Sequence, residues 1–114
     1  MNYKYPEELE FFDTGFGVYD ENDPGEGLFS YIYIYEGDSE FVVTYSPSSK
    51  ISFSAKLITK GIMVFNIYQE YVSKIAFQAW SDEKVIRIYC NTKSINTEFR
   101  LDYLPHPGIY VANT

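Results

Sequence analysis

The feature that most limits the fold is an alternation of apolar and polar residues that begins after Leu28 and continues along most of the chain. In its clearest segment, Ile51 to Leu57, an apolar residue stands at every second position and Ser or Lys stands between. A period of two places successive side chains on opposite faces of a strand, and an antiparallel sheet with one buried face produces this pattern. We therefore expect a chain made mostly of antiparallel strands.

Similar segments, rich in β-branched and aromatic residues, recur with short turn-like clusters between them. One cluster, Glu36-Gly37-Asp38-Ser39, favours a hairpin. The fold class predicted is mainly β, an antiparallel meander that forms a curved sheet, a small sandwich or an open barrel, with at most one or two short helices. The predicted strands cover residues 29–35, 40–45, 51–57, 62–68, 74–80, 85–90 and 99–103.

Three segments depart from the clear strand pattern. Pro6 and the glutamates that follow it favour one or two helical turns, since proline suits the first helical position and carboxylates complement the helix dipole. Asp13 to Gly27 contains four glycines, a proline and an acidic run, which are typical of a surface loop. In Ile67 to Trp80 apolar residues also recur every four positions, so this segment is either strand or helix.

Length and cysteine content set the broad class of the protein. A chain of 114 residues can close one hydrophobic core, so we expect a single domain over residues 1–114. Cys90 is the only cysteine, which excludes an intramolecular disulfide and fits a reducing compartment. The sequence near Met1 does not resemble a signal peptide, and no run approaches the roughly 20 apolar residues of a membrane span. These features predict a cytoplasmic protein.

Charge is distributed unevenly along the sequence. Residues 5–49 contain eleven Asp and Glu and no Lys or Arg, whereas residues 50–114 contain eight basic and five acidic residues. Residues 5–49 therefore carry a charge of −11, and the rest of the chain, at +4, brings the net charge to −7. A negative field repels phosphate backbones and anionic lipids and attracts basic protein surfaces. We expect neither nucleic acid nor membrane as a direct partner.

Few residues are suited to catalysis or metal binding. His106 is the only histidine, which excludes sites with two histidines, and Cys90 lies in an apolar segment typical of an inert thiol. A Cys90–His106 nucleophilic pair would require the two residues to meet in the fold. Asp20 to Gly27 offers carboxylates to a cation, but Pro24 and Tyr31 stand where an EF-hand loop needs ligands. We predict no catalytic residues, no metal site and no cofactor.

One predicted strand carries a row of aromatic residues. Tyr31, Tyr33 and Tyr35 share one face, with isoleucines on the other. If the isoleucine face packs inward, the tyrosines lie on the surface as interface anchors beside acidic residues. Alternatively, the loop Asp13 to Gly27 covers the row. Under the first alternative the partner-binding residues are Asp20, Glu21, Asp23, Glu26, Tyr31, Tyr33, Tyr35, Glu36, Asp38 and Glu40.

A small acidic protein with aromatic-rich antiparallel strands resembles the immunity proteins of bacterial contact-dependent growth inhibition and related polymorphic toxin systems. The resemblance lies in the acidic segment Glu7 to Glu40, the strand Phe29 to Tyr35 and the alternating run Glu98 to Tyr103. It implies tight binding to a cognate toxin domain, often a basic nuclease, whose active site is blocked by carboxylates in place of substrate phosphates. We therefore expect a non-enzymatic inhibitor, a monomer or weak dimer, that binds its toxin through an acidic, tyrosine-rich surface.

Other functions remain compatible with the sequence. A β-domain for sugar or another small molecule would use Trp80 and the tyrosines as stacking platforms, although most polysaccharide-binding sandwiches act outside the cell. An enzyme would have to rely on carboxylates and tyrosines for acid–base chemistry. Self-association would use an exposed edge at Tyr31 to Tyr35.

Overall fold

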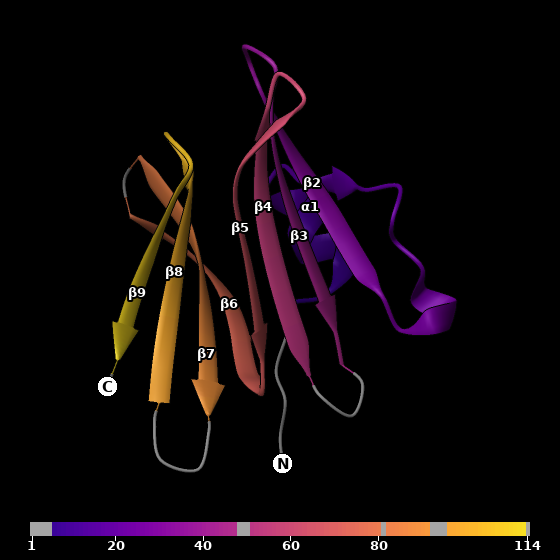
Figure 1. Ribbon diagram of the computed structural model, residues 1–114, viewed down its shortest axis with the longest axis vertical. Coiled ribbons are helices and arrows are strands. Elements are labelled where there is room, and N and C mark those ends of the chain that lie inside the picture. The colour runs from indigo at the N-terminus through magenta and orange to yellow at the C-terminus, as the bar shows by residue number, and fades with distance from the viewer. Residues whose placement is uncertain (1–5, 48–50, 81, 92–95, 114) are drawn as a thin grey trace. The chain divides into compact units, whose positions relative to one another are not determined.

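The computed structural model describes residues 6–47, 51–80, 82–91 and 96–113 (Figure 1). The chain is mainly antiparallel β-structure, as predicted, and it forms two compact units. The N-terminal unit is Glu7–Glu70, and the C-terminal unit is Tyr71–Thr114 together with Met1–Pro6. That both units belong to a single domain stays a prediction.

The N-terminal unit contains a sheet whose strands are neighbours in chain order, β1-β2-β3-β4-β5, and every pair is antiparallel. This order is the predicted meander. Its elements are α1 (Glu8–Asp13), β1 (Gly17–Val18), a 3-10 helix η1 (Pro24–Glu26), β2 (Phe29–Tyr35), β3 (Ser39–Ser46), β4 (Ser52–Thr59) and β5 (Ile62–Glu70).

Two hairpins of this sheet depend on residues with left-handed backbone. Gly37 (φ 84°) and Asp38 (φ 67°) lie in the predicted turn between β2 and β3, and Lys60 (φ 53°) and Gly61 (φ 78°) join β4 to β5. Two consecutive residues with positive φ match the right-handed twist of the flanking strands, which is why Gly and Asp are favoured here. The backbone N–H of Lys60 donates to the carbonyl of Asp38 at 2.9 Å, so the two turns are joined.

Strand register gives the N-terminal sheet two chemically different faces. One row across β2 to β5 is Tyr31–Val43–Ala55–Ile67, and the adjacent row on the opposite face is Ser30–Thr44–Ser54–Tyr68. We call these the aromatic face and the open face. The aromatic face supplies the core of this unit, with the buried residues Tyr31, Phe41, Val43, Tyr45, Phe53, Ala55 and Leu57.

Helix α1 covers the aromatic face over β2 and β3. Phe11, which has no exposed surface, stacks on Tyr31 with ring centroids 4.0 Å apart and also lies 6.1 Å from the Tyr45 ring. The helix begins at Glu8, two residues after the predicted Pro6, with Glu7 as N-cap. It ends where the Thr14 hydroxyl donates to the backbone carbonyl of Phe11 at 2.9 Å.

The segment Ile67 to Trp80 is strand, so the helical alternative is wrong. It contains the end of β5 and all of β6, with Tyr71 (φ 62°) between them. Residue Ile67 lies opposite Ala55 on β4, and Ile75 lies opposite Ile88 on β7. Pairing with strands distant in sequence therefore outweighs the local helix propensity of this segment.

The C-terminal unit holds a second antiparallel meander in the order β6-β7-β8-β9. Its apolar face buries residues such as Ile86, Ile88 and Leu101. The last strand was not predicted, because its alternation is short and follows a Pro- and Gly-containing turn. The strands are β6 (Val72–Trp80), β7 (Glu83–Asn91), β8 (Asn96–Leu104) and β9 (Gly108–Asn113).

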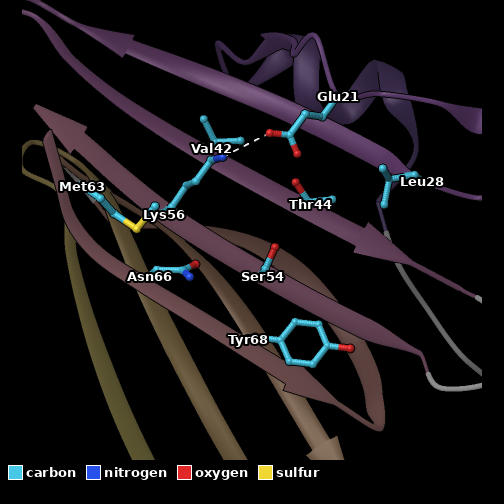
Figure 2. A pocket seen from close by; sticks show the side chains of 9 residues that line it. All are labelled: Glu21, Leu28, Val42, Thr44, Ser54, Lys56, Met63, Asn66 and Tyr68. Atoms are coloured by element: carbon cyan, nitrogen blue, oxygen red, sulfur yellow. Dashed lines mark hydrogen bonds and ion pairs between the residues drawn. The ribbon is translucent and has the colours of Figure 1, made fainter. Parts of the chain in front are cut away.

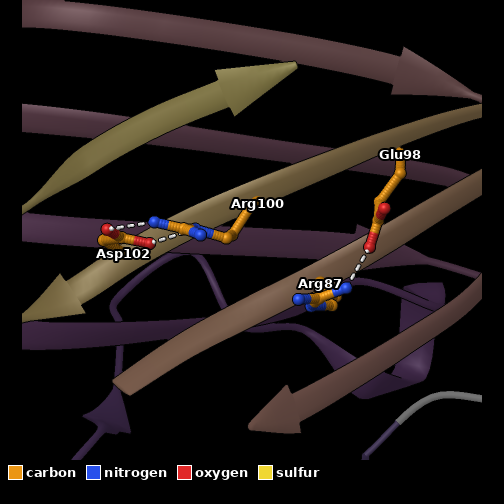
Figure 3. Close-up of polar contacts among 4 residues, drawn as sticks. All are labelled: Arg87, Glu98, Arg100 and Asp102. Carbon is orange, nitrogen blue, oxygen red and sulfur yellow. Dashed lines mark hydrogen bonds and ion pairs between the residues drawn. The ribbon is translucent and has the colours of Figure 1, made fainter. Parts of the chain in front are cut away.

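The opposite face of this second sheet carries paired charges (Figure 3). Arg87 and Arg100 face each other on β7 and β8, an arrangement that would destabilise the sheet if the two charges were left alone. Arg87 Nη1 donates to Glu98 Oε1 at 2.7 Å, and Arg100 donates through two nitrogens to Asp102 at 2.9 and 3.2 Å. The Arg100 guanidinium also lies 4.7 Å from the centroid of the Tyr110 ring. These contacts stabilise the sheet itself.

Candidate partner-binding surface

The tyrosine row lies on the aromatic face, where other aromatic side chains cover it. Only 1% of Tyr31 is exposed beneath Phe11, and burial together with the nearby Glu8 carboxylate raises the pKa of its hydroxyl. Tyr33 and Tyr35 are half-buried, and Phe16 packs edge-on against Tyr33 at 5.4 Å. The expectation of a surface row is therefore wrong for Tyr31, which is a core residue.

The cover comes from α1 and from the beginning of the predicted loop. Gly15 (φ 99°) sits so close to Tyr33 that a Cβ built on it would lie 3.0 Å from the ring. Its missing side chain lets the backbone descend onto the tyrosine. The alternative in which Asp13 to Gly27 covers the row is thus correct for Tyr33, whereas Phe11 of α1 covers Tyr31.

The predicted acidic residues lie at the two ends of β2 rather than around the tyrosines. One group follows β1 and the other occupies the β2–β3 turn (Figure 1). Seven strand residues separate the groups, a length of about 20 Å. Glu40 is half-buried on the open face, in register with Ile34 and Ile58. The exposed acids are Asp20, Glu21, Asp23 and Glu26 in the first group, and Glu36 and Asp38 in the second.

The first acidic group is held in place by hydrogen bonds between backbone groups and by one hydrogen bond to the Asn22 side chain. The N–H of Tyr19 donates to the carbonyl of Ser30 at 3.0 Å, and the N–H of Ser30 donates to Asn22 Oδ1 at 2.9 Å. Asp23 and Leu28 exchange backbone hydrogen bonds of 2.8 and 2.9 Å. This segment is therefore a fixed border of the open face.

A groove of about 320 Å³ lies on the open face between this border and β5 (Figure 2). Side chains from β3, β4 and β5 form it, and Val42, only 1% exposed, is one of them. Hydroxyl and amide groups share the lining with apolar side chains, so the groove can both pack and hydrogen-bond a guest. We call it the open-face groove; its lining residues are Glu21, Leu28, Val42, Thr44, Ser54, Lys56, Met63, Asn66 and Tyr68.

Lys56 is the basic residue in this lining, and it already has anionic and aromatic neighbours. Its Nζ lies 3.2 Å from Glu21 Oε1 and 5.5 Å from the centroid of the Tyr19 ring. Figure 2 shows the ammonium group reaching across the groove toward the Glu21 carboxylate. The two side chains are 25% and 54% exposed, and such surface ion pairs contribute between about 0 and 1 kcal/mol. The groove is thus locally neutral.

A row of three apolar residues and one glutamate, which we call the apolar row, lies beside the groove near the two hairpin turns. Register aligns Ile34, Glu40, Ile58 and Met63 across β2 to β5 on the open face. Ile34 is 69% exposed and Met63 is 54% exposed. A bulge between Leu57 and Ile58 shifts the pairing so that Met63 enters this row. Met63 therefore belongs both to the row and to the open-face groove.

The residues considered for catalysis do not meet. Cys90 lies opposite Thr97, near the beginning of β8, whereas His106 is exposed and follows the end of that strand at Leu104. Seven residue steps along β8, about 23 Å, separate these levels. Burial raises the pKa of the Cys90 thiol to about 11, so the nucleophilic thiolate is suppressed. The Cys90–His106 pair is thereby excluded.

Within the described parts of the chain, no three His, Cys, Asp or Glu side chains are grouped so as to hold a metal ion, the Asp20 to Gly27 segment included. In the same residues, no helix combines the length and apolar character needed to cross a membrane.

Sequence reasoning missed the groove because it followed the aromatic half of the alternation. The polar residues of the alternation are the ones that indicate the groove. The polar positions of the alternation include Ser54 and Lys56 on β4 and Asn66 and Tyr68 on β5. These side chains lie together because the two strands pair in register. A comparison of the polar positions in consecutive predicted strands would have identified most of the residues that line the groove.

The fold defines an antiparallel β-meander protein whose N-terminal sheet carries a groove on its open face. In sequence, no family model and no curated protein matches the chain. In structure, the chain is similar to a chain of the contact-dependent growth inhibition toxin–immunity protein complex from Klebsiella pneumoniae 342, with 12% identity and a TM-score of 0.83. The match covers 98% of this chain and 97% of that chain. The resemblance to proteins of contact-dependent growth inhibition is confirmed at the level of the fold.

Proposed function

We propose that the chain is an immunity protein that binds and neutralises a cognate toxin. The observation that carries this proposal is the fold match, which spans nearly all of both chains. The matched complex contains a toxin and an immunity protein, so the fold match has to be combined with the side-chain chemistry of this chain to distinguish the two roles. A protein that inhibits by binding needs a complementary surface and no reacting groups.

The side-chain inventory favours the inhibitor. The single histidine is exposed and distant from the single cysteine, whose raised pKa keeps it protonated. The open face, in contrast, offers apolar, hydroxyl and acidic groups together. This chemistry supports a non-enzymatic binding role.

Charge supports a basic toxin. The N-terminal unit holds twelve acidic residues and three lysines, a net −9, whereas the C-terminal unit holds four acidic and six basic residues, a net +2. The excess of negative charge therefore lies in the N-terminal unit. A surface of this sign speeds the capture of a basic partner such as a nuclease, whose active site attracts phosphates. Such an immunity protein would act in the cytoplasm.

Co-expression tests the proposal. The gene adjacent to this one is expected to encode a toxin, and its C-terminal domain should arrest growth when expressed alone and not when expressed with this chain. The purified chains should form a stable complex that elutes as one species in size-exclusion chromatography. Growth arrest in the presence of this chain, with no complex between the purified proteins, would contradict the proposal.

The open-face groove favours one second candidate, a small-molecule-binding β-domain. Its volume of about 320 Å³ lies at the lower end of ligand pockets, which span about 300–1,000 Å³. Titration calorimetry with a set of mono- and oligosaccharides would detect such binding. A specific sugar complex together with a failure to protect cells from the toxin would favour this alternative.

A further inference from the structure

We propose that the open face of the N-terminal sheet is the docking surface for the toxin. The contact would centre on the apolar row of Ile34, Ile58 and Met63 and extend into the open-face groove. Its occupant is a basic surface of the partner protein with a protruding apolar side chain. This inference rests on the proposed function and adds to it the face, the anchors and the chemistry of the partner.

The first argument is the exposure of large apolar side chains on the face opposite α1. Ile34 and Met63 are 69% and 54% exposed although both are paired with neighbouring strands, at the ends of β2 and β5 that adjoin the hairpin turns. Their row crosses three strand spacings, a distance of about 14 Å. Glu40 stands between Ile34 and Ile58 in this row, so the face presents exposed apolar anchors beside a carboxylate, and a few such anchors carry most of the binding energy at protein interfaces.

The second argument is the continuity of this row with polar groups. Met63 joins the row to the groove, where Thr44, Ser54 and Tyr68 are aligned on adjacent strands (Figure 2). Protein interfaces combine an apolar centre with a hydrogen-bonding rim, and the open face has both parts side by side. The aromatic face has no such role over β2 and β3, because Phe11 covers it there.

The third argument is charge complementarity. The acidic residues at the two ends of β2 border the open face, and they belong to a unit of net −9. Lys56, the basic side chain of the groove, is compensated by Glu21 at 3.2 Å. A basic partner therefore meets an anionic border on either side of the apolar row. An acidic partner would be repelled by the same border.

Substitution of the anchors tests the surface. Ile34→Asp and Met63→Asp, measured separately by surface plasmon resonance with the toxin domain, should each raise Kd at least tenfold. The matched control is Leu9→Asp, because Leu9 is 67% exposed in the same unit but on α1, which covers the opposite face. The control should stay within twofold of wild type. Because all three positions are exposed, circular dichroism should show unchanged folding.

A second pair separates local contact from net charge. Glu21→Lys and Glu10→Lys change the charge of the same unit equally, and both side chains are exposed. The open-face surface predicts that Glu21→Lys weakens binding at least fivefold more than Glu10→Lys, since Glu21 borders the groove and Glu10 lies on α1. Equal losses would indicate steering by net charge alone and would overturn the docking role of the groove border.

The Met63 methyl group provides a probe of the surface in the wild-type protein. The sequence has two methionines, Met1 and Met63, so methyl labelling of methionine gives two NMR signals that Met63→Leu can assign. Toxin binding should shift or broaden the Met63 signal. Two results together would overturn the docking surface and leave the proposed function standing. The wild-type protein would bind the toxin with an unchanged Met63 signal, and the Asp variants would bind it with undiminished affinity. Absence of binding by the wild type would overturn the proposed function itself.

Discussion

The Phe11 ring stacks face to face on the Tyr31 ring, with centroids 4.0 Å apart and an interplanar angle of 9°. Phe11 comes from a helix of six residues, too short to be stable without tertiary packing. The stacked pair attaches the helix to β2, and it decides which face of the N-terminal sheet is covered. The open face, with its groove and apolar row, is the consequence.

The first prediction concerns this pair. Phe11→Ala should lower the free energy of unfolding by about 3–5 kcal/mol, because a fully buried aromatic side chain is lost and a cavity remains. Leu9→Ala, on the exposed side of the same helix, should change it by less than about 0.5 kcal/mol. Urea unfolding followed by circular dichroism measures both. Similar losses for the two variants would contradict a specific role of the Phe11–Tyr31 packing in holding α1.

The fold class was predictable because sheet burial leaves a strong trace in the sequence. The alternation in Ile51 to Leu57 and the hairpin at Glu36 to Ser39 both correspond to observed elements. The orientation of the Tyr31 row was not predictable, since both faces of β2 are apolar in sequence and only the position of α1 distinguishes them. The segment Ile67 to Trp80 was ambiguous for a similar reason: its strand character depends on partners distant in sequence.

The candidate site was predictable only in part. The acidic border could be read from Asp20 to Glu26, because uncompensated charge is visible in composition. The groove could not, since it arises from the lateral pairing of residues such as Thr44, Ser54 and Tyr68, whose strand neighbours depend on register. A one-residue change in register would place the opposite set of side chains on this face.

The second prediction concerns a part-buried hydrogen bond on the open face. The hydroxyls of Ser30, fully buried, and Thr44 lie 2.8 Å apart on β2 and β3. Thr44→Val should lower the free energy of unfolding by about 1–3 kcal/mol, because the Ser30 hydroxyl loses this partner without reaching water. The double variant Ser30→Ala/Thr44→Val should lose less than the sum of the two single variants. Additive losses in chemical denaturation would show that the hydroxyls are not coupled.

The third prediction is a pH dependence at the Cys90 thiol. Burial raises its pKa to about 11 in the folded chain, against an ordinary value near 9. Below pH 9 the thiol is protonated in both states and contributes no pH dependence. Between pH 9 and 11 the unfolded state releases its proton first, so the free energy of unfolding falls by up to about 1.4 kcal/mol per pH unit.

Urea titrations of the wild type and Cys90→Ala at pH 8, 9 and 10 test this dependence. The Ala variant should be less stable at pH 8 and should lose less stability as pH rises, because other groups titrate equally in both proteins. Parallel pH profiles would place the thiol in a solvated environment. In the native protein, alkylation by iodoacetamide at pH 8 should also be much slower than in urea, since the buried thiol forms little thiolate.

The fourth prediction concerns the acidic border and the rate of toxin capture. Reversal of Asp20, Asp23, Glu36 and Asp38 to lysine should lower the association rate constant at least tenfold, because the exposed carboxylates that attract a basic partner are replaced by repelling charges. The control is reversal of Asp82 and Glu83, two exposed acids of the C-terminal unit, which should change the rate less than threefold. Stopped-flow fluorescence at low and high salt measures the rates. The wild-type rate should fall steeply with salt, since the Debye length shortens from about 30 Å at 0.01 M to about 8 Å at 0.15 M. Equal effects of the two sets, or a wild-type rate that ignores salt, would refute a capture step guided by the acidic border.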